Sequence, residues 1–126
     1  MNENEISKII IECALKVHSE LGPGLLESVY ERALSHELIK QRLFVECQKP
    51  IPIIYDGEEL GEAFRADIIV NDKVIIEIKS VEELNPVHYK QLQTYLKLAD
   101  KKLGLLMNFN KKLLKEGLKR IINGTI

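Results

Sequence analysis

Apolar positions in the first forty residues recur at steps of three and four, the spacing that places side chains on one face of a helix. This pattern predicts two amphipathic helices, one over roughly 4–20 and one beginning after Gly24 and running to about Gln41. The intervening Leu-Gly-Pro-Gly segment ends the first helix, because glycine provides a left-handed cap and proline blocks continuation. The chain is therefore expected to begin with a pair of helices.

Beyond this helical pair the apolar period changes to two, which predicts strands. The expected strands cover residues 44–48, 51–55, 60–70, 73–79 and 103–108. Asp56-Gly57 is a hairpin signal between two of these strands. Asn71-Asp72 predicts a second tight turn, in which two residues connect Val70 to Lys73.

Prolines and the remaining segments complete the predicted architecture. Pro50 and Pro52 place the strand over 51–55 at an edge of the sheet or give it an irregular start. Asn85-Pro86 predicts an N-cap and the first position of a helix that continues to about residue 99, whereas residues 113–122 are ambiguous between a short helix and a last strand. This order predicts one α/β or α+β domain over residues 1–126, with helices packed on a central sheet.

Composition excludes several classes of protein. The chain has 126 residues, of which 45% are hydrophobic and 29% charged, unlike disordered, collagen-like or low-complexity sequences. Its longest apolar runs are a few residues, against the ~18 that a membrane helix needs, and its polar first residues do not resemble a secretory signal. Cys13 and Cys47 are too few for a disulfide framework, so we expect two buried free thiols in a cytoplasmic protein.

Charge is distributed unevenly along the chain. Residues 1–96 carry 10 Lys/Arg and 17 Asp/Glu, a net of −7, whereas residues 97–126 carry 8 and 2, a net of +6. A uniformly basic coat for nucleic acid is therefore excluded. The C-terminal lysines form either a basic face beside an acidic body or a set of ordinary solvated side chains.

The most informative chemistry lies in the predicted hairpin around Asn71-Asp72. Because strand side chains alternate, Glu77 and Lys79 should share one side of the sheet. A two-residue turn would pair Asp67 with Ile76 and make Glu77 its diagonal neighbour, so twist or a bulge must decide whether the two carboxylates converge. The alternative is that Glu77 and Lys79 form an ordinary surface pair.

Two converging carboxylates would form an anionic oxygen site suited to Mg²⁺ or Mn²⁺. A metal ion there can polarise a phosphoryl oxygen and lower the pKa of bound water, and Lys79 can orient the water or offset developing charge. Two helices add candidates. Glu27 lies in the first turn of the second helix, where its alternative role is to complement the helix dipole. Gln91 and Tyr95 are four residues apart on the later helix and share a face, from which Gln91 could reach the sheet.

Several motifs together carry a resemblance to a known family. They are Gly24-Leu25-Leu26-Glu27-Ser28-Val29-Tyr30, Phe64-Arg65-Ala66-Asp67, Ile76-Glu77-Ile78-Lys79, His88-Tyr89-Lys90-Gln91-Leu92-Gln93-Thr94-Tyr95 and Leu103-Gly104-Leu105-Leu106-Met107-Asn108-Phe109. In this order they resemble the GxxExxY protein family of the PD-(D/E)XK nuclease-like superfamily. The resemblance covers nearly the whole chain and implies a restriction-endonuclease-like core, in which helices flank a central mixed sheet.

The resemblance also implies roles for individual residues. Asp67 and Glu77 match the metal-binding carboxylates, with the Ile78 carbonyl as a further ligand, and Lys79 matches the catalytic lysine. Glu27 matches a helical acidic residue that supports or joins the metal site. Gln91 and Tyr95 match a Gln-x-x-x-Tyr motif that supports the site and the substrate backbone. The residue before Asp67 is alanine where many relatives have proline.

These observations favour a Mg²⁺- or Mn²⁺-dependent nuclease that hydrolyses DNA or RNA. Arg65 is a candidate phosphate contact because it lies close to Asp67 in sequence, and the basic C-terminal residues could follow a nucleic-acid backbone. These residues are Lys111, Lys112, Lys115, Lys119 and Arg120. The alternative is a catalytically silent nuclease-fold module that binds or regulates through a protein partner or a homodimer. A hydrolase of small phosphorylated metabolites is less favoured because no glycine-rich phosphate loop is visible.

Overall fold

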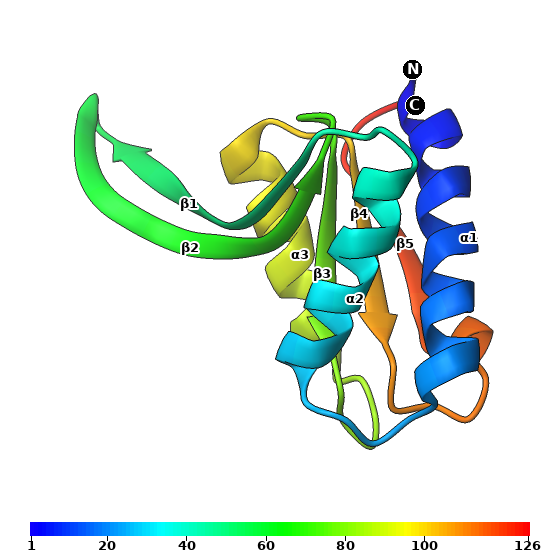
Figure 1. Cartoon of the computed structure of the whole chain (residues 1–126). Helices are drawn as coiled ribbons and strands as arrows, with labels where there is room; N and C mark the ends of the chain where they lie inside the picture. Colours follow the sequence, from blue (N-terminus) through cyan, green and yellow to red (C-terminus); the bar gives the residue numbers. More distant parts are fainter.

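The computed structural model describes residues 1–126 and has the predicted order of helices and strands (Figure 1). The elements are α1 (Glu3–Leu21), α2 (Glu27–Lys40), β1 (Val45–Tyr55), β2 (Glu58–Val70), β3 (Val74–Lys79), α3 (Pro86–Ala99), β4 (Leu103–Asn108), the 3₁₀ turn η1 (Leu114–Glu116) and β5 (Leu118–Ile122). The two strands expected over 44–48 and 51–55 form one strand, β1. The ambiguous segment 113–122 contains both a 3₁₀ turn and a strand.

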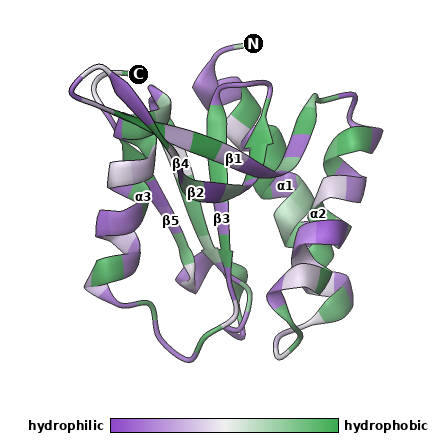
Figure 2. Ribbon diagram, turned by 90° about the vertical axis from the view of Figure 1, so that its left-hand side faces the viewer, coloured by the Kyte–Doolittle hydropathy of each residue, from purple (hydrophilic) through white to green (hydrophobic).

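The five strands form one mixed sheet in the order β1-β2-β3-β4-β5. Only β3 and β4 are parallel, because α3 connects them by a crossover; the other neighbouring pairs are antiparallel. Helices α1 and α2 cover one face and α3 covers the other (Figure 2). This arrangement is the predicted α/β architecture with a restriction-endonuclease-like core.

Each face of the sheet has its own apolar core. The larger core, under α1 and α2, includes Ile68, Ile76 and Ile78 from the central strands. The smaller core, under α3, includes Ile75 and Leu106. Because β3 is buried on both faces, a charged side chain on this strand must be paired or functional.

Tyr30 fixes the start of α2 against the rest of the protein. Its ring is fully buried and stacks on Phe109 with 4.6 Å between ring centroids. Its hydroxyl donates to the Gly22 carbonyl at 2.6 Å and accepts the Leu25 N–H at 3.1 Å. The loop before α2 is thereby held to the first turns of α2, and Glu27 lies in these turns.

The turn between β2 and β3 differs from the sequence prediction. Val70 pairs with Val74, so three residues form the turn instead of two, and Asn71 and Asp72 both adopt left-handed backbone angles. The register is therefore Ile68 opposite Ile76, and Asp67 and Glu77 are the next residues along the two strands, where this pairing ends. The predicted pairing of Asp67 with Ile76 was wrong by one residue, and the observed register brings the Asp67 and Glu77 carboxyl groups close together.

At Asp67, the side chains of β2 also change the face of the sheet to which they point. Phe64 and Ala66 belong to the core under α3, whereas Ile68 belongs to the core under α1 and α2. Alternate residues of a regular strand share a face, so the strand is irregular at this point. The irregularity lies where the two carboxylates meet.

Between Asp67 and the turn at Asp56 and Gly57, β1 and β2 extend away from the rest of the sheet as a long curved hairpin (Figure 1). Strand β1 is an edge strand, which confirms the expectation from Pro50 and Pro52, and its pairing is irregular around Pro52. Asp56 and Gly57 form the predicted turn. One expectation about the thiols was wrong: Cys13 is buried, but Cys47 on this edge strand is exposed.

None of the helices combines the length and the apolar character needed to cross a membrane.

Candidate active site

Asp67 lies where the pairing between β2 and β3 ends. Its Oδ2 accepts the backbone N–H of Ile78 at 2.8 Å, so the side chain takes the place of the next backbone acceptor. Its Oδ1 accepts a hydrogen bond from Gln48 Nε2 at 3.2 Å. These two bonds fix the carboxylate against β3, close to Glu77.

Glu77 is a buried carboxyl group in the middle of the sheet, with 7% of its surface exposed. Its Oε1 is buried and has no hydrogen-bond partner. Burial, and after it the neighbouring Asp67, raise the pKa of Glu77 to about 9 against the opposing effect of the Lys79 ammonium. In the absence of a cation, Glu77 is therefore protonated at neutral pH.

Lys79 follows Glu77 by two residues and is half-buried at the end of β3. Strand alternation directs its side chain to the same side of the sheet as Glu77, and its charge acts on the pKa of that carboxyl group. The Lys79 carbonyl accepts the N–H of Phe109 at 2.9 Å, which anchors the strand end. The structure therefore brings together Asp67, Glu77 and Lys79.

Glu27 is held at the neighbouring strand end. Its Oε2 accepts the backbone N–H of Ser80 at 3.0 Å, and Ser80 Oγ donates to the Leu25 carbonyl at 2.7 Å. The first turn of α2 is thus bonded to the residue directly after Lys79. This contact makes Glu27 a support for the strand end. Glu27 does not join Asp67 and Glu77 in a metal-binding cluster, because no group of three or more His, Cys, Asp or Glu side chains is arranged to hold a metal ion.

Glu31 is a site residue that the sequence interpretation missed. Gln48 Nε2 donates to Glu31 Oε1 at 2.6 Å and to Asp67 at 3.2 Å, so one amide nitrogen links the two carboxylates. Burial raises the pKa of Glu31, the Gln48 hydrogen bond lowers it, and the charge of Asp67 raises it. The available signal was helical spacing: Glu31 follows Glu27 by four residues and shares its face.

Gln48 makes this link from an unusual backbone conformation. Its φ is +52°, in the left-handed region, although it lies within β1. A left-handed residue other than glycine in a strand is strained, and such strain often occurs at functional sites. The sequence alone gives no indication of this role.

The predicted supporting residues lie in different surroundings. Tyr95 is half-buried and stacks on Phe64 with 3.8 Å between ring centroids. Burial raises the pKa of Tyr95, and the charges of Glu77 and Asp67 also raise it. Tyr95 therefore lies on the carboxylate side of the sheet. Gln91 is exposed and makes no side-chain hydrogen bond within the chain, while Arg65 is exposed and pairs with Glu62 at 3.1 Å. The predicted phosphate contact through Arg65 is thus not prearranged.

A buried asparagine, also missed in the sequence, holds the loop after β3. The Asn108 side chain donates to the Val81 carbonyl at 2.9 Å and accepts the Val81 N–H at 3.1 Å. It is fully buried at the end of β4. Because β4 runs parallel to β3, this amide fixes the backbone immediately beyond Lys79.

The donor set fits a hard divalent cation. Mg²⁺ in proteins is commonly held by one or two carboxylates and keeps several waters. Asp67 and Glu77 can provide these carboxylates, and Glu77 Oε1 is an acceptor that no protein donor uses. A cation beside it would offset the burial that now keeps Glu77 protonated.

Comparison with known proteins supports the same assignment. The sequence profile of the PD-(D/E)XK nuclease superfamily matches residues 4–121, which is nearly the whole chain. Searches of curated proteins and of solved structures gave no significant match. The match includes both carboxylates, the lysine and the helices that surround them, and the chain belongs to the PD-(D/E)XK nuclease superfamily.

Proposed function

We propose that this chain is a metal-dependent nuclease that hydrolyses phosphodiester bonds of DNA or RNA. The observation that carries the proposal is the convergence of Asp67 and Glu77 across neighbouring strands, with Lys79 on the same side. Two carboxylates and a lysine are the groups that metal-assisted phosphoryl chemistry requires. Hydrolysis adds one water across a P–O bond, leaving a phosphate monoester and a hydroxyl group.

Each residue has a defined part in this proposal. Asp67 and Glu77 hold Mg²⁺ or Mn²⁺, with the Ile78 carbonyl as a further ligand, and the ion supplies charge stabilisation and a more acidic water. Lys79 orients the attacking water and offsets charge that develops on the phosphate. Glu27 fixes the backbone after Lys79 through Ser80 and completes the acidic side of the site.

The remaining candidates act on the substrate side. Tyr95 lies near the carboxylates and supports their position through its stacked ring. Gln91 and Arg65 are exposed, and they reach a phosphate only by rotating toward bound nucleic acid. With no Trp and seven Phe and Tyr residues in the chain, no stacking platform for reading bases is evident.

The second candidate function is a nuclease-fold module that binds without cleaving. The hydrogen bonds from Gln48 to Glu31 and Asp67 favour it, because they satisfy part of the acidic site without a cation. The two functions differ in one measurable respect: only the nuclease needs Lys79 for turnover.

The test uses labelled single- and double-stranded DNA and RNA with Mg²⁺, with Mn²⁺ or with EDTA. The nuclease proposal expects cleavage that requires the metal and falls by at least about 100-fold in Lys79→Ala, while Lys8→Ala on the exposed face of α1 is unchanged. No cleavage by the wild type on any substrate, with Mn²⁺ bound as measured by electron paramagnetic resonance, would instead support the binding module. Cleavage that survives in Lys79→Ala would overturn the role of that lysine.

A further inference from the structure

Hydrolysis of a phosphodiester bond needs a group that takes a proton from the attacking water. A carboxylate can do this where it lies beside the reacting atoms and keeps an oxygen that no protein donor uses. Both oxygens of Asp67 already accept hydrogen bonds, one from the Ile78 N–H and one from Gln48. Glu77 is a proposed cation ligand, and the Lys79 ammonium has no lone pair to accept a proton. The proton acceptor must therefore be another carboxylate.

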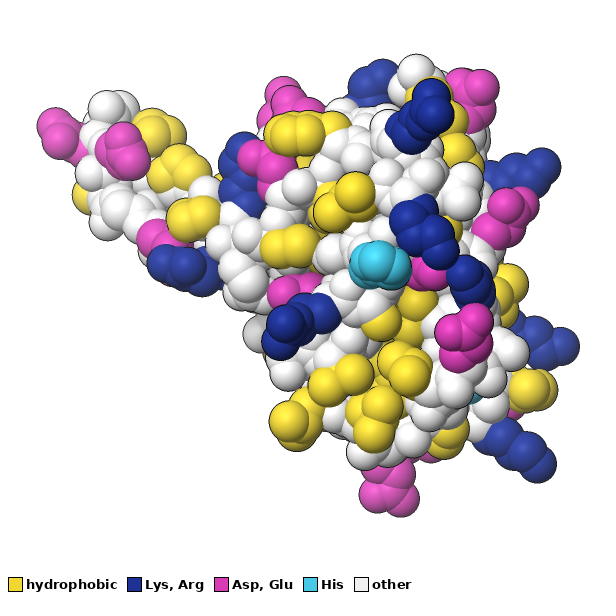
Figure 3. Space-filling view, in the orientation of Figure 1, with side chains coloured by type: hydrophobic (Ala, Val, Ile, Leu, Met, Phe, Trp, Pro, Cys, Tyr) yellow, Lys and Arg dark blue, Asp and Glu magenta, His cyan; other side chains and the backbone are white.

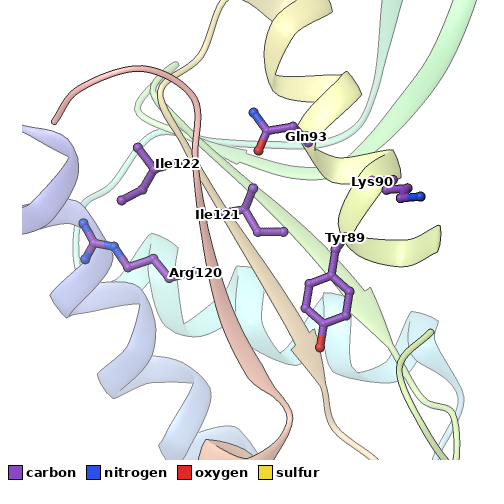
Figure 4. A pocket seen from close by; sticks show the side chains of 6 residues that line it. All are labelled: Tyr89, Lys90, Gln93, Arg120, Ile121 and Ile122. Carbon is purple, nitrogen blue, oxygen red and sulfur yellow. The ribbon is translucent and has the colours of Figure 1, made fainter. Parts of the chain in front are cut away.

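Acidic side chains in other parts of the molecule do not reach the site. Residues 56–59, at the tip of the β1–β2 hairpin, include three carboxylates, and this tip projects away from the body (Figure 3). The cavity of about 430 Å³ between α3 and β5 has no carboxylate among its lining residues (Figure 4). Glu37, near the end of α2, is paired with Lys16 and Lys40. The remaining carboxylates next to the site are those at the start of α2.

Helix α2 carries two such carboxylates, and they are held differently. Glu27 Oε2 accepts the Ser80 N–H, which keeps this side chain at the end of β3. Glu31 shares a donor with the candidate metal ligand: Gln48 Nε2 lies 2.6 Å from Glu31 Oε1 and 3.2 Å from Asp67 Oδ1. Glu31 Oε2 accepts no hydrogen bond from the chain. Glu31 is thus a carboxylate that lies beside Asp67 and keeps one oxygen free.

The surroundings of Glu31 suit a proton acceptor. The side chain is half-buried, and burial is the largest influence, raising its pKa. The hydrogen bond from Gln48 opposes this shift, and the charge of Asp67 adds to it. A carboxylate with a raised pKa takes a proton more readily, because its pKa is then closer to the pH at which the reaction runs.

We propose that Glu31 is the catalytic proton acceptor of this site, an assignment that rests on the proposed nuclease function. Glu31 Oε2 takes one proton from the attacking water, and the water oxygen forms a bond to phosphorus. The P–O bond to the leaving group breaks, and the departing oxygen takes a proton from solvent. Glu31 then returns its proton to solvent, so each turnover consumes one water and restores the carboxylate.

Glu31→Gln tests this role with little change in structure, because the glutamine carbonyl can still accept the hydrogen bond from Gln48. Cleavage should fall by at least about 100-fold. Mn²⁺ affinity, measured by electron paramagnetic resonance, and oligonucleotide affinity, measured by fluorescence anisotropy in EDTA, should stay within about twofold of wild type. Glu20→Gln, at an exposed position on α1, is the matched control and should leave all three quantities unchanged.

Glu31→Ala adds a signature that a purely structural residue would not give. Removing the side chain leaves room for a small carboxylate, so added formate should restore cleavage at least about tenfold in Glu31→Ala and have no effect on Lys79→Ala. Undiminished cleavage in Glu31→Gln, loss of its Mn²⁺ binding, or failure of formate to rescue Glu31→Ala would overturn the role of Glu31 alone. A folded wild type that cleaves no substrate would overturn the nuclease function and this assignment with it.

Discussion

The Asp67 carboxylate accepts the backbone N–H of Ile78 at 2.8 Å, so a side chain completes the strand pairing at the point where the backbone of β2 leaves the sheet. This contact has two consequences. It fixes the carboxylate beside Glu77, and it makes Asp67 a structural residue as well as a candidate metal ligand. A substitution at Asp67 must therefore be chosen so that these two roles are separated.

Asp67→Asn separates the two roles. The asparagine carbonyl can still accept the Ile78 N–H, so we expect the free energy of unfolding to change by about 1 kcal/mol or less. Loss of the negative charge should weaken Mn²⁺ binding at least about tenfold. Electron paramagnetic resonance and denaturant unfolding measure the two effects. Asp72→Asn, at an exposed carboxylate paired with Lys101, serves as the control for metal binding. Equal Mn²⁺ affinity in wild type and Asp67→Asn would remove Asp67 from the site.

Glu77 predicts how stability depends on pH in the absence of metal. Its pKa is about 9 in the folded protein and 4.5 ordinarily, so folding favours its protonated form. This contribution is complete below pH 4.5 and is lost progressively as the pH rises through about 9. Between these limits the free energy of unfolding should fall with pH by about 1 kcal/mol per unit relative to a variant that cannot ionise.

Glu77→Gln is that variant. Compared with wild type in EDTA, it should gain relative stability as the pH is raised from 5 to 8, by a total of about 3 kcal/mol. Denaturant unfolding at several pH values measures the difference. Saturating Mn²⁺ should reduce the slope in wild type and have little effect on Glu77→Gln. Parallel pH profiles for the two proteins in EDTA would contradict the buried, protonated state of Glu77.

Gln48→Ala tests the link between Glu31 and Asp67. Removing the amide leaves two carboxylates facing one another without their shared donor, so the protein should lose about 1 kcal/mol of stability. The same change frees Asp67 Oδ1 for a cation, and Mn²⁺ should bind about fivefold more tightly. Gln41→Ala, at an exposed position after α2, is the matched control. Weaker Mn²⁺ binding in Gln48→Ala would mean that Gln48 helps to build the metal site.

Gly104→Ala tests how closely α3 must approach the sheet. A Cβ at Gly104 would lie 2.9 Å from Leu92 Cγ, so the side chain or the helix must move. We expect a loss of about 1–3 kcal/mol from overpacking, measured by denaturant unfolding. In a Leu92→Ala background the same substitution should cost less, because the space is then available. Additive losses in the double variant would show that the strain does not come from Leu92.

Much of the fold could be predicted from local patterns. The three- and four-residue spacing gave both N-terminal helices, and Asn85-Pro86 marked the start of α3. Strand alternation also placed Glu77 and Lys79 on one side of β3. The turn after β2 was misjudged by one residue because Asn71-Asp72 has the composition of a two-residue turn, whereas packing of Val70 against Val74 sets the register.

The sequence by itself determined which residue types are available for chemistry: two carboxylates and a lysine on adjacent strands, with an acidic helix start nearby. Only the tertiary structure decided how they meet. The pairing of β2 with β3 brings Asp67 close to Glu77, burial between two cores raises the pKa of Glu77, and Gln48 on the neighbouring strand β1 joins Glu31 to the site. The physical reason is that helical and strand periodicity are local, whereas register, burial and contacts between elements depend on the packing of the whole chain.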